Sequence, residues 1–327
     1  MRRRDFIGLI GGAAAANILP LASRAQQPMP VIGILNMQTQ ESETARLAAL
    51  RQGLKETGFV EGQNVTIVSL FAEGQNDRLP ALAAELVRRQ VAVLVANTTP
   101  PAHAAKAATA TIPIVFAFGA DPVELGFVAS FNRPGANITG VAFLVNKLVA
   151  KRLELLCQVV PKTAAVGMLA DVNNPNAESD MRDAQAAAAT LGRTLHIVKV
   201  ATLSDIETAF AALVQQGAAA VFVAPHANFR IWRPQLAALA LRHGLPSSYS
   251  TSDFVTAGGL MSYGPDLLDS YRQAGIYVGR ILKGDKPAEL PVVQPVRFEF
   301  VINLKTAKTL GLEIPPMLLA LTTGVIE

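Results

Sequence analysis

Short apolar runs alternate with amphipathic segments along most of the chain. Val31–Leu35 is apolar throughout, and residues 43–57 then carry leucines at helical spacing up to Gly58, which suits the end of a helix. Strands that are apolar on both faces belong to parallel sheets covered by helices on each side. The pattern predicts strands at 31–35, 65–71, 91–96 and 112–118, helices at 43–57, 79–89 and 101–109, and a further helix capped by Asp121 that starts at Pro122.

This order of elements occurs twice. Gly33 and Gly58 have counterparts in Gly167 and Gly192, and each pair is 134 residues apart. Solenoid repeats have periods of about 20–50 residues, so a period this long indicates a duplicated domain. The second copy predicts helices at 147–159, 177–191, 204–215 and 233–243, and strands at 165–170, 195–200, 219–224 and 246–250.

Three segments are predicted to connect the two copies. Residues 132–147 combine a turn-rich approach, a short apolar strand and a polar exit, and residues 258–264 and 292–303 are further extended segments beyond the repeat. We predict an α/β fold: two similar doubly wound parallel-sheet lobes joined by a hinge of about three crossings. The predicted lobes comprise residues 28–143 plus 261–290 and residues 144–260 plus 296–327.

Composition excludes several classes of protein. A chain of 327 residues with 50% hydrophobic residues can bury two sizeable cores. The formal net charge is +4, but four arginines and one aspartate in residues 1–25 contribute +3 of it. The remaining +1, without a long basic run, argues against a nucleic-acid partner. Cys157 is the only cysteine, which excludes an internal disulfide and a cysteine-rich metal site, and we expect it to be a buried, unreactive residue.

The first 25 residues have the character of an export signal. A charged start is followed by an apolar run over residues 6–21, and residues 23–25 fit a small-x-small cleavage site. Arg3 and Arg4 resemble a twin-arginine motif, and an arginine-rich Sec signal is the alternative. No cysteine follows the apolar run, and no later run reaches the roughly 20 residues of a membrane span. We predict a periplasmic protein, cleaved near Ala25, without a membrane anchor.

Polar side chains follow nearly every predicted strand. In open parallel sheets, ligands bind where the carboxyl ends of strands meet helix N-termini. Neutral amides and hydroxyls there can hydrogen-bond a ligand, and helix N-termini favour a carboxylate. We therefore expect a small zwitterion or polar organic molecule as ligand. The candidate ligand-binding residues are Asn36, Gln38, Thr39, Asn97, Thr98, Thr99, Gly119, Ala120, Asp121, Asn173, Asn174, Asn176, His226, Ser250, Thr251, Asp253 and Tyr263.

Some of these candidates also have an ordinary structural explanation. Asp121 and Asn174 each precede a proline and suit helix caps, whatever the function. His226 could cap a helix or lie at the surface, and Tyr263 could pack in the core. Few aromatic residues are available to stack on a ligand near the predicted loop ends: Phe118, Phe229, Trp232, Phe254 and Tyr263.

The sequence carries no recognisable signature of catalysis or of a cofactor. The four histidines lack His-x-x-x-His spacing, and no serine lies in a Gly-x-Ser-x-Gly elbow. The first strand is not followed by Gly-x-Gly-x-x-Gly, and there is no Walker loop. Asp121 and Asp253 could approach each other across the cleft, but nothing poises them for acid–base work. We expect no enzyme activity, no metal and no cofactor.

Six ordered motifs between residue 28 and the C-terminus resemble one family. They are Arg51–Asn64, Arg78–Leu82, Ile112–Val115, Asn132–Gly135, Gly258–Gly264 and Val301–Ala307. They are similar to motifs of the ABC-transporter substrate-binding proteins of the tryptophan/tyrosine type. The resemblance implies a type I periplasmic binding fold and an exported receptor that closes on its ligand and delivers it to an ABC permease and its ATPase in the inner membrane.

The resemblance also bears on individual residues. In amino-acid receptors of this type, the loops after the third and fourth strands of the first lobe hold the amino and carboxylate groups, which correspond here to residues 97–99 and 119–121. Residues 250–253 depart from the bulkier, more charged sequence common in the family, so the side-chain pocket is expected to differ. An exported α/β enzyme acting on a similar small molecule and a ligand sensor for a membrane receptor are the alternative functions.

Overall fold

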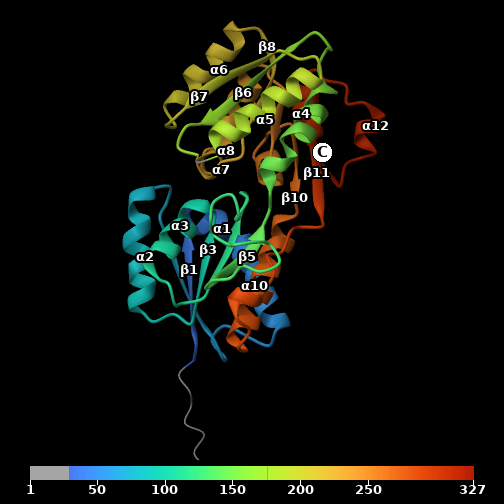
Figure 1. Ribbon diagram of the computed structural model, residues 1–327. Coiled ribbons are helices and arrows are strands. Elements are labelled where there is room, and N and C mark those ends of the chain that lie inside the picture. The colour runs from blue at the N-terminus through green and yellow to red at the C-terminus, as the bar shows by residue number, and fades with distance from the viewer. Residues whose placement is uncertain (1–28, 175) are drawn as a thin grey trace, which may run out of the picture.

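The computed structural model describes residues 29–174 and 176–327. The predicted export signal, residues 1–25, and Pro175 lie outside the described residues. The described chain forms two α/β bodies, one built on a five-stranded sheet and the other on a seven-stranded sheet. Figure 1 shows the first body below the second.

The first sheet has the order β2-β1-β3-β4-β5, and all of its strands are parallel. Apolar side chains cover both faces of its central strands, as their sequences predict. Helices α1 and α10 pack on one face of the sheet, and α2 and α3 pack on the other. The elements are β1 (Val31–Asn36), α1 (Gln40–Glu56), β2 (Thr66–Phe71), η1 (Asn76–Arg78), α2 (Leu79–Arg88), β3 (Val93–Asn97), α3 (Thr99–Ala108), β4 (Ile114–Phe118), β5 (Ile138–Ala142) and α10 (Leu267–Leu282).

The second sheet has the order β12-β11-β10-β9-β8-β6-β7. Its strands are parallel except for β10 and β11, which pair in the antiparallel direction. The elements of this body are η2 (Val145–Leu148), α4 (Val149–Cys157), β6 (Ala165–Asp171), α5 (Ala177–Thr190), β7 (Leu195–Val200), α6 (Asp205–Gln215), β8 (Ala218–Val223), α7 (Ala227–Ile231), α8 (Arg233–Arg242), β9 (Ser247–Tyr249), α9 (Ser252–Thr256), β10 (Met261–Pro265), β11 (Phe298–Asn303), α11 (Leu304–Thr309), α12 (Pro316–Leu319) and β12 (Gly324–Ile326).

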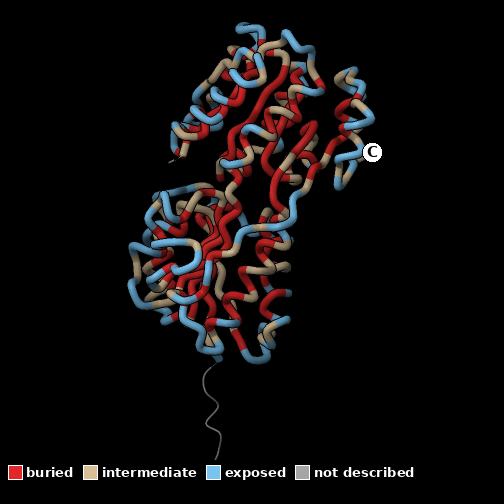
Figure 2. The backbone as a smooth tube through the Cα atoms, turned by 45° about the vertical axis from the view of Figure 1, so that its right-hand side comes forward, coloured by how far each residue is buried: buried red, intermediate tan, exposed pale blue. Residues whose placement is uncertain are grey.

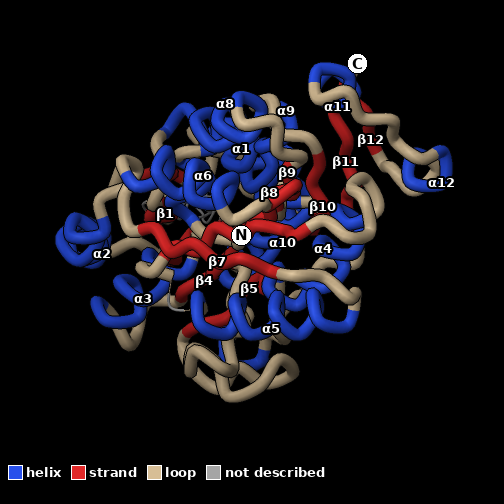
Figure 3. The backbone as a smooth tube through the Cα atoms, turned by 90° about the horizontal axis from the view of Figure 1, so that it is seen from above, coloured by secondary structure: helices blue, strands red, loops and turns tan. Residues whose placement is uncertain are grey.

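The chain passes between the two bodies three times. It leaves the first sheet after β5, returns between β10 and α10, and leaves again after η3 (Pro287–Glu289), where Val293 still pairs with Val141 of β5. In Figure 3 the last elements, β11, β12, α11 and α12, gather at one edge of the molecule. β10 belongs to the second sheet, whereas α10 packs on the first. The lobe boundaries at residues 143 and 261 stay a prediction.

Helices α1 and α10 approach each other closely because glycines lie between them. A Cβ atom on Gly53 would be 1.9 Å from the carbonyl oxygen of Arg272, and one on Gly275 would be 2.1 Å from that of Leu50. Only a residue without a side chain allows backbone contact of this kind. This helix pair anchors α10, which follows β10 of the second body directly along the chain (Figure 1). Figure 2 shows that buried segments form the interior of both bodies.

The structure differs from the sequence prediction in several elements. The helix predicted to begin at Pro122 is a turn, in which Asp121 Oδ1 accepts hydrogen bonds from the backbone N–H groups of Val123 and Glu124. The short helices α7, α9 and α12 and the edge strand β12 were not predicted. Within residues 29–174 and 176–327, none of the helices combines the length and apolar character needed to span a membrane.

Candidate functional site

A cavity of about 90 Å³ lies between the two bodies, at the carboxyl ends of their strands. Every segment that reaches it follows a strand or begins a helix. The lining residues are Thr98, Thr99, Pro100, Phe118, Gly119, Ala120, Phe143, Val145, Asn146, Asn174, Asn176, Pro225, His226, Ala227, Arg230, Ser250, Thr251 and Leu267. The lining combines apolar and aromatic side chains with amides, hydroxyls, one imidazole and the guanidinium of Arg230.

The structure brings nine of the seventeen candidate residues to this wall. They are Thr98, Thr99, Gly119, Ala120, Asn174, Asn176, His226, Ser250 and Thr251. They come from five different strand ends, far apart in the sequence, which is the convergence expected of parallel sheets. Their role in binding stays a prediction.

The other eight candidates lie elsewhere in the structure. Asn36 and Asn97 are buried and bonded to each other, with Asn97 Nδ2 donating to Asn36 Oδ1 over 2.5 Å, and Gln38 is buried beyond the end of β1. Thr39 is the N-cap of α1. Asp121 lines a neighbouring groove, and the side-chain amide of Asn173 donates to the carbonyl of Ala201. Asp253 pairs with arginines, and Tyr263 stacks on Phe298.

Several lining residues were missed by the sequence analysis. Val145 and Asn146 begin η2 shortly after the end of β5 at Ala142, so the strand-end rule would have found them had it been applied to the crossing strand. Arg230 lies in α7, a helix of five residues that was not predicted. Of the five aromatic candidates, only Phe118 lines the cavity, where Phe143 joins it.

Thr98 is held in an unusual backbone conformation at the cavity wall. Its φ and ψ are 76° and 165°, which side-chain-bearing residues rarely adopt and which costs about 1–3 kcal/mol. Its Oγ1 is buried and has no hydrogen-bond partner among the described residues. Thr99 begins α3, where the positive end of the helix dipole favours an anion. This end of the cavity is therefore suited to a carboxylate.

His226 is fixed in place by a buried carboxylate. Its Nδ1 lies 2.6 Å from Asp171 Oδ2, which also accepts a hydrogen bond from Asn228 Nδ2 over 2.9 Å. Burial raises the pKa of Asp171, but the hydrogen bond and charge of His226 and the N–H of Asn173 outweigh it, so the pKa lies below its ordinary value. Because an ionised carboxylate only accepts, Nδ1 carries a proton and Nε2 is left to interact elsewhere.

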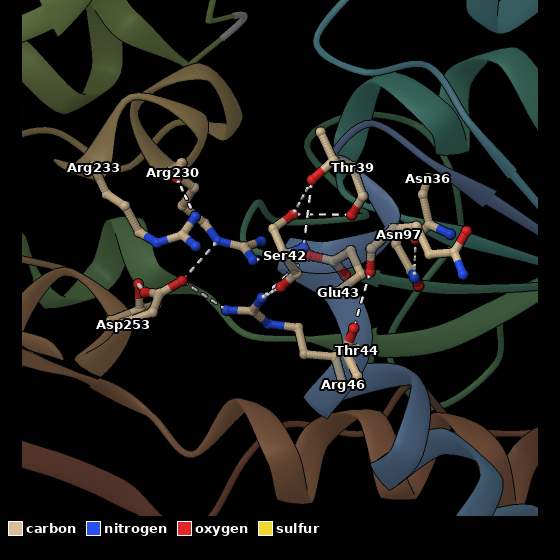
Figure 4. Close-up of polar contacts among 12 residues, drawn as sticks. Asn36, Thr39, Ser42, Glu43, Thr44, Arg46, Asn97, Arg230, Arg233 and Asp253 are labelled. Carbon is tan, nitrogen blue, oxygen red and sulfur yellow. Dashed lines mark hydrogen bonds and ion pairs between the residues drawn. The ribbon is translucent and has the colours of Figure 1, made fainter. Parts of the chain in front are cut away.

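A network of four charged side chains joins the two bodies beside the cavity, as Figure 4 shows. Glu43 Oε1 of α1 accepts from Arg46 Nη1 over 3.1 Å and from Arg230 Nη2 over 3.0 Å. Asp253 Oδ2 accepts from Arg46 Nη2 over 2.9 Å and lies 3.5 Å from Arg230 Nε. Burial alone would raise the pKa of Asp253, but the charges of Arg230 and Arg46 outweigh this effect and hold the pKa well below its ordinary range. Two acids thus balance two bases across the cleft.

This network changes what the cavity can recognise. Arg230 lines the cavity, but its guanidinium is already paired with Glu43 and Asp253. Although burial lowers the pKa of Arg230, these two carboxylates raise it above its usual value, so the side chain stays charged and paired. The site therefore presents little net charge from this network. Among the described residues there is no group of three His, Cys, Asp or Glu side chains arranged to hold a metal ion.

Comparison with known proteins agrees with this architecture. The family model described as ABC transporter substrate binding protein matches residues 31–326. A tyrosine-binding protein of Clostridioides difficile (strain R20291) is 27% identical over 283 residues, which covers 86% of this chain and 81% of the relative.

Two solved structures share the whole fold. A conserved domain protein from Vibrio cholerae is 28% identical with a TM-score of 0.84, and the match covers 91% of this chain and 99% of the other. The ABC domain from Streptococcus pneumonia in complex with L-Trp is 26% identical with a TM-score of 0.82 and the same coverage. The predicted α/β fold of two parallel-sheet lobes and the predicted family are thereby confirmed. The chain belongs to the family of ABC transporter substrate-binding proteins, which are non-catalytic solute-binding components of ABC importers.

Proposed function

We propose that this protein captures an amino acid with a large apolar side chain, of the tyrosine or tryptophan class, in the cavity between its two lobes. The observation that carries the proposal is the mixed lining of the cavity. Thr98, Thr99 and Asn146 supply polar groups, and Phe118 and Phe143 supply aromatic rings. A zwitterionic head and an apolar side chain match these two kinds of group. The names of the similar proteins, which refer to tyrosine binding and to an L-Trp complex, support the same class.

Closure of the lobes is the proposed mechanism of capture. The lobes, with the boundaries predicted above, move about the three crossings, and a ligand that contacts both lobes favours the closed arrangement. The predicted export signal supports a periplasmic location, in which the closed form delivers the ligand to an ABC permease and its ATPase. The candidate residues that line the cavity are the proposed ligand-binding residues.

Thermal unfolding of the purified protein tests the ligand class. L-Tyrosine, L-tryptophan, aliphatic amino acids and small organic acids are each added at increasing concentration. A ligand that binds only the folded state adds about 2.7 kcal/mol at 100 times its dissociation constant, which for a chain of this length raises the midpoint by roughly 4 °C. A rise with the aromatic amino acids and none with organic acids is expected. Equal rises with every compound, or none with tyrosine and tryptophan, would contradict the proposal.

Replacement of Thr98 tests the carboxylate end of the site. Thr98→Ala removes the buried Oγ1, and a lost hydrogen bond to a charged group is worth about 1.5–3 kcal/mol, so we expect the dissociation constant for the amino acid to rise at least tenfold. Thr98→Ser keeps the hydroxyl and serves as the matched control, with a smaller change. Isothermal titration calorimetry measures both, and equal affinity of the Ala and Ser variants would remove Thr98 from the site.

A further inference from the structure

Asp180 of α5 lies directly behind the cavity wall and holds two of its amides. The side chain is fully buried. Its Oδ1 accepts a hydrogen bond from Asn146 Nδ2, and its Oδ2 accepts one from Asn174 Nδ2 over 3.2 Å. Both asparagines line the cavity, whereas Asp180 does not. The acid can therefore act on a ligand only through these two side chains.

The two amides depend on Asp180 to different degrees. Asn174 has further partners, since its Nδ2 also donates to the carbonyl of Pro225 over 3.1 Å and its Oδ1 accepts from the N–H of Asn176 over 3.0 Å. Among the described residues, the side chain of Asn146 forms a hydrogen bond only with Asp180. An ionised carboxylate only accepts hydrogen bonds, so it requires the NH₂ group of Asn146 to face it. The carbonyl oxygen Oδ1 of Asn146 is then turned away from Asp180 and has no donor among the described residues.

Asp180 forms no ion pair with any residue in the described part of the chain, although two charged side chains lie near it. Arg152 of α4 and Asp183 of α5 itself are the charged groups that act on it. Arg152 directs its donors to the backbone carbonyls of Val223, Ser248 and Tyr249 instead. Asn146 in η2 and Asn174 after β6 contact Asp180 through their neutral side-chain amides.

We propose that Asp180, acting through Asn146, forms a subsite for the ammonium group of the ligand and so selects amino acids over the corresponding acids without an amino group. This inference rests on the proposed function. The Asn146 oxygen, free of a protein donor, is an acceptor for an N–H⁺ group, and the carboxylate behind it supplies the negative charge. Asp180 is thus a positioning residue that fixes which atom of the amide a ligand meets.

The same arrangement makes binding depend on pH. Burial raises the pKa of Asp180 to about 7, against the opposing effects of the Asn146 hydrogen bond and the Arg152 charge. A bound ammonium group favours the ionised carboxylate. Below about pH 7 the free protein carries a proton on Asp180 that must leave when the ligand binds, so affinity falls as the pH falls, by up to tenfold per pH unit. Above that pH the affinity becomes constant.

Calorimetric titrations between pH 5.5 and 8 test this inference with two matched pairs of probes. L-Tryptophan is compared with indole-3-propionate, and L-tyrosine with 3-(4-hydroxyphenyl)propionate, because each acid lacks only the amino group. For the wild type we expect the affinity for the amino acid to fall with falling pH and that for the acid not to fall. In Asp180→Asn the neutral amide no longer imposes the orientation of Asn146, so the amino acid should bind about tenfold more weakly at pH 8 and without pH dependence.

Two controls separate this subsite from other causes. Asp183→Asn removes an exposed carboxylate from the same helix whose charge raises the pKa of Asp180, so the pH dependence should persist with its midpoint moved to lower pH. Histidine is a common source of pH dependence near neutrality, so His226→Gln should keep the slope if Asp180 causes it. Loss of the slope in His226→Gln, or its persistence in Asp180→Asn, would overturn the inference.

The experiment also distinguishes the two proposals. If neither amino acid binds the wild type, the proposed function fails and the ammonium subsite fails with it. If the amino acids bind but the acids bind as tightly with the same pH profile, the proposed function stands and only the subsite is wrong. This comparison needs the wild type alone, so it decides the question even if Asp180→Asn does not fold.

Discussion

Glu43→Ala is expected to destabilise the protein by about 3–5 kcal/mol and to shift the two lobes towards an open arrangement. Glu43, at 0% exposure, accepts hydrogen bonds from both Arg46 and Arg230, which are 7% and 9% exposed. Without it, two buried guanidinium groups share the single carboxylate of Asp253. Removing one partner from a buried charge network leaves an uncompensated charge, which is the origin of a cost of this size.

The position of Glu43 makes the effect on lobe arrangement specific. It lies on α1 of the first body, and Arg230 lies on α7 of the second, so the lost contact is one that exists only while the bodies are together. Urea unfolding measures the change in stability, and small-angle X-ray scattering measures the increase in radius of gyration. Glu41→Ala, on the same helix turn but exposed, is the control. Equal effects of the two substitutions on both quantities would show that the network does not hold the lobes.

Gly275→Ala is expected to lower the free energy of unfolding by about 3 kcal/mol, at the upper end of the range for overpacking. The added Cβ would be 2.1 Å from the carbonyl oxygen of Leu50, so the backbones of α1 and α10 must separate. A backbone atom cannot turn aside as a flexible side chain can. Because α10 carries Leu267 to the cavity, we also expect weaker ligand binding.

Chemical denaturation of the variant and the wild type checks this prediction. Gly324→Ala is the matched control, because its Cβ would meet Val301 only at 3.6 Å, an ordinary contact distance. The control should change stability by well under 1 kcal/mol. Similar losses in both variants would mean that the cost arises from the loss of glycine itself and not from the helix contact.

The sequence pattern predicts the fold well because its signals are local and repeated. Continuous apolar runs such as residues 91–96 define buried parallel strands, and the period of 134 residues reveals the duplication without any knowledge of contacts. The short helices α7 and α9 escape this reasoning because five residues complete little more than one turn and show no periodicity. Pro122 suits a helix start, yet the chain there forms only a turn, since tertiary packing overrides a local preference.

The site was only partly accessible from the sequence for a different reason. The strand-end rule locates Thr98, Asn174 and His226, because it depends on topology alone. The pairing of Glu43 with Arg230 joins residues 187 positions apart, and nothing in the local sequence of either indicates the partner. The local sequence around Asp253 likewise does not indicate its partners. Asp253 was therefore expected to meet the ligand, whereas its carboxylate pairs with two arginines.

The first crossing between the bodies also forms part of the cavity wall, through Phe143, Val145 and Asn146. These residues belong to the hinge about which the bodies would turn, and they also form part of the surface that would contact the ligand. A substitution there therefore alters shape complementarity to the ligand and the mechanics of the hinge in a single step. Attempts to redesign this protein as a biosensor would find that specificity and amplitude of motion cannot be adjusted independently at these three positions.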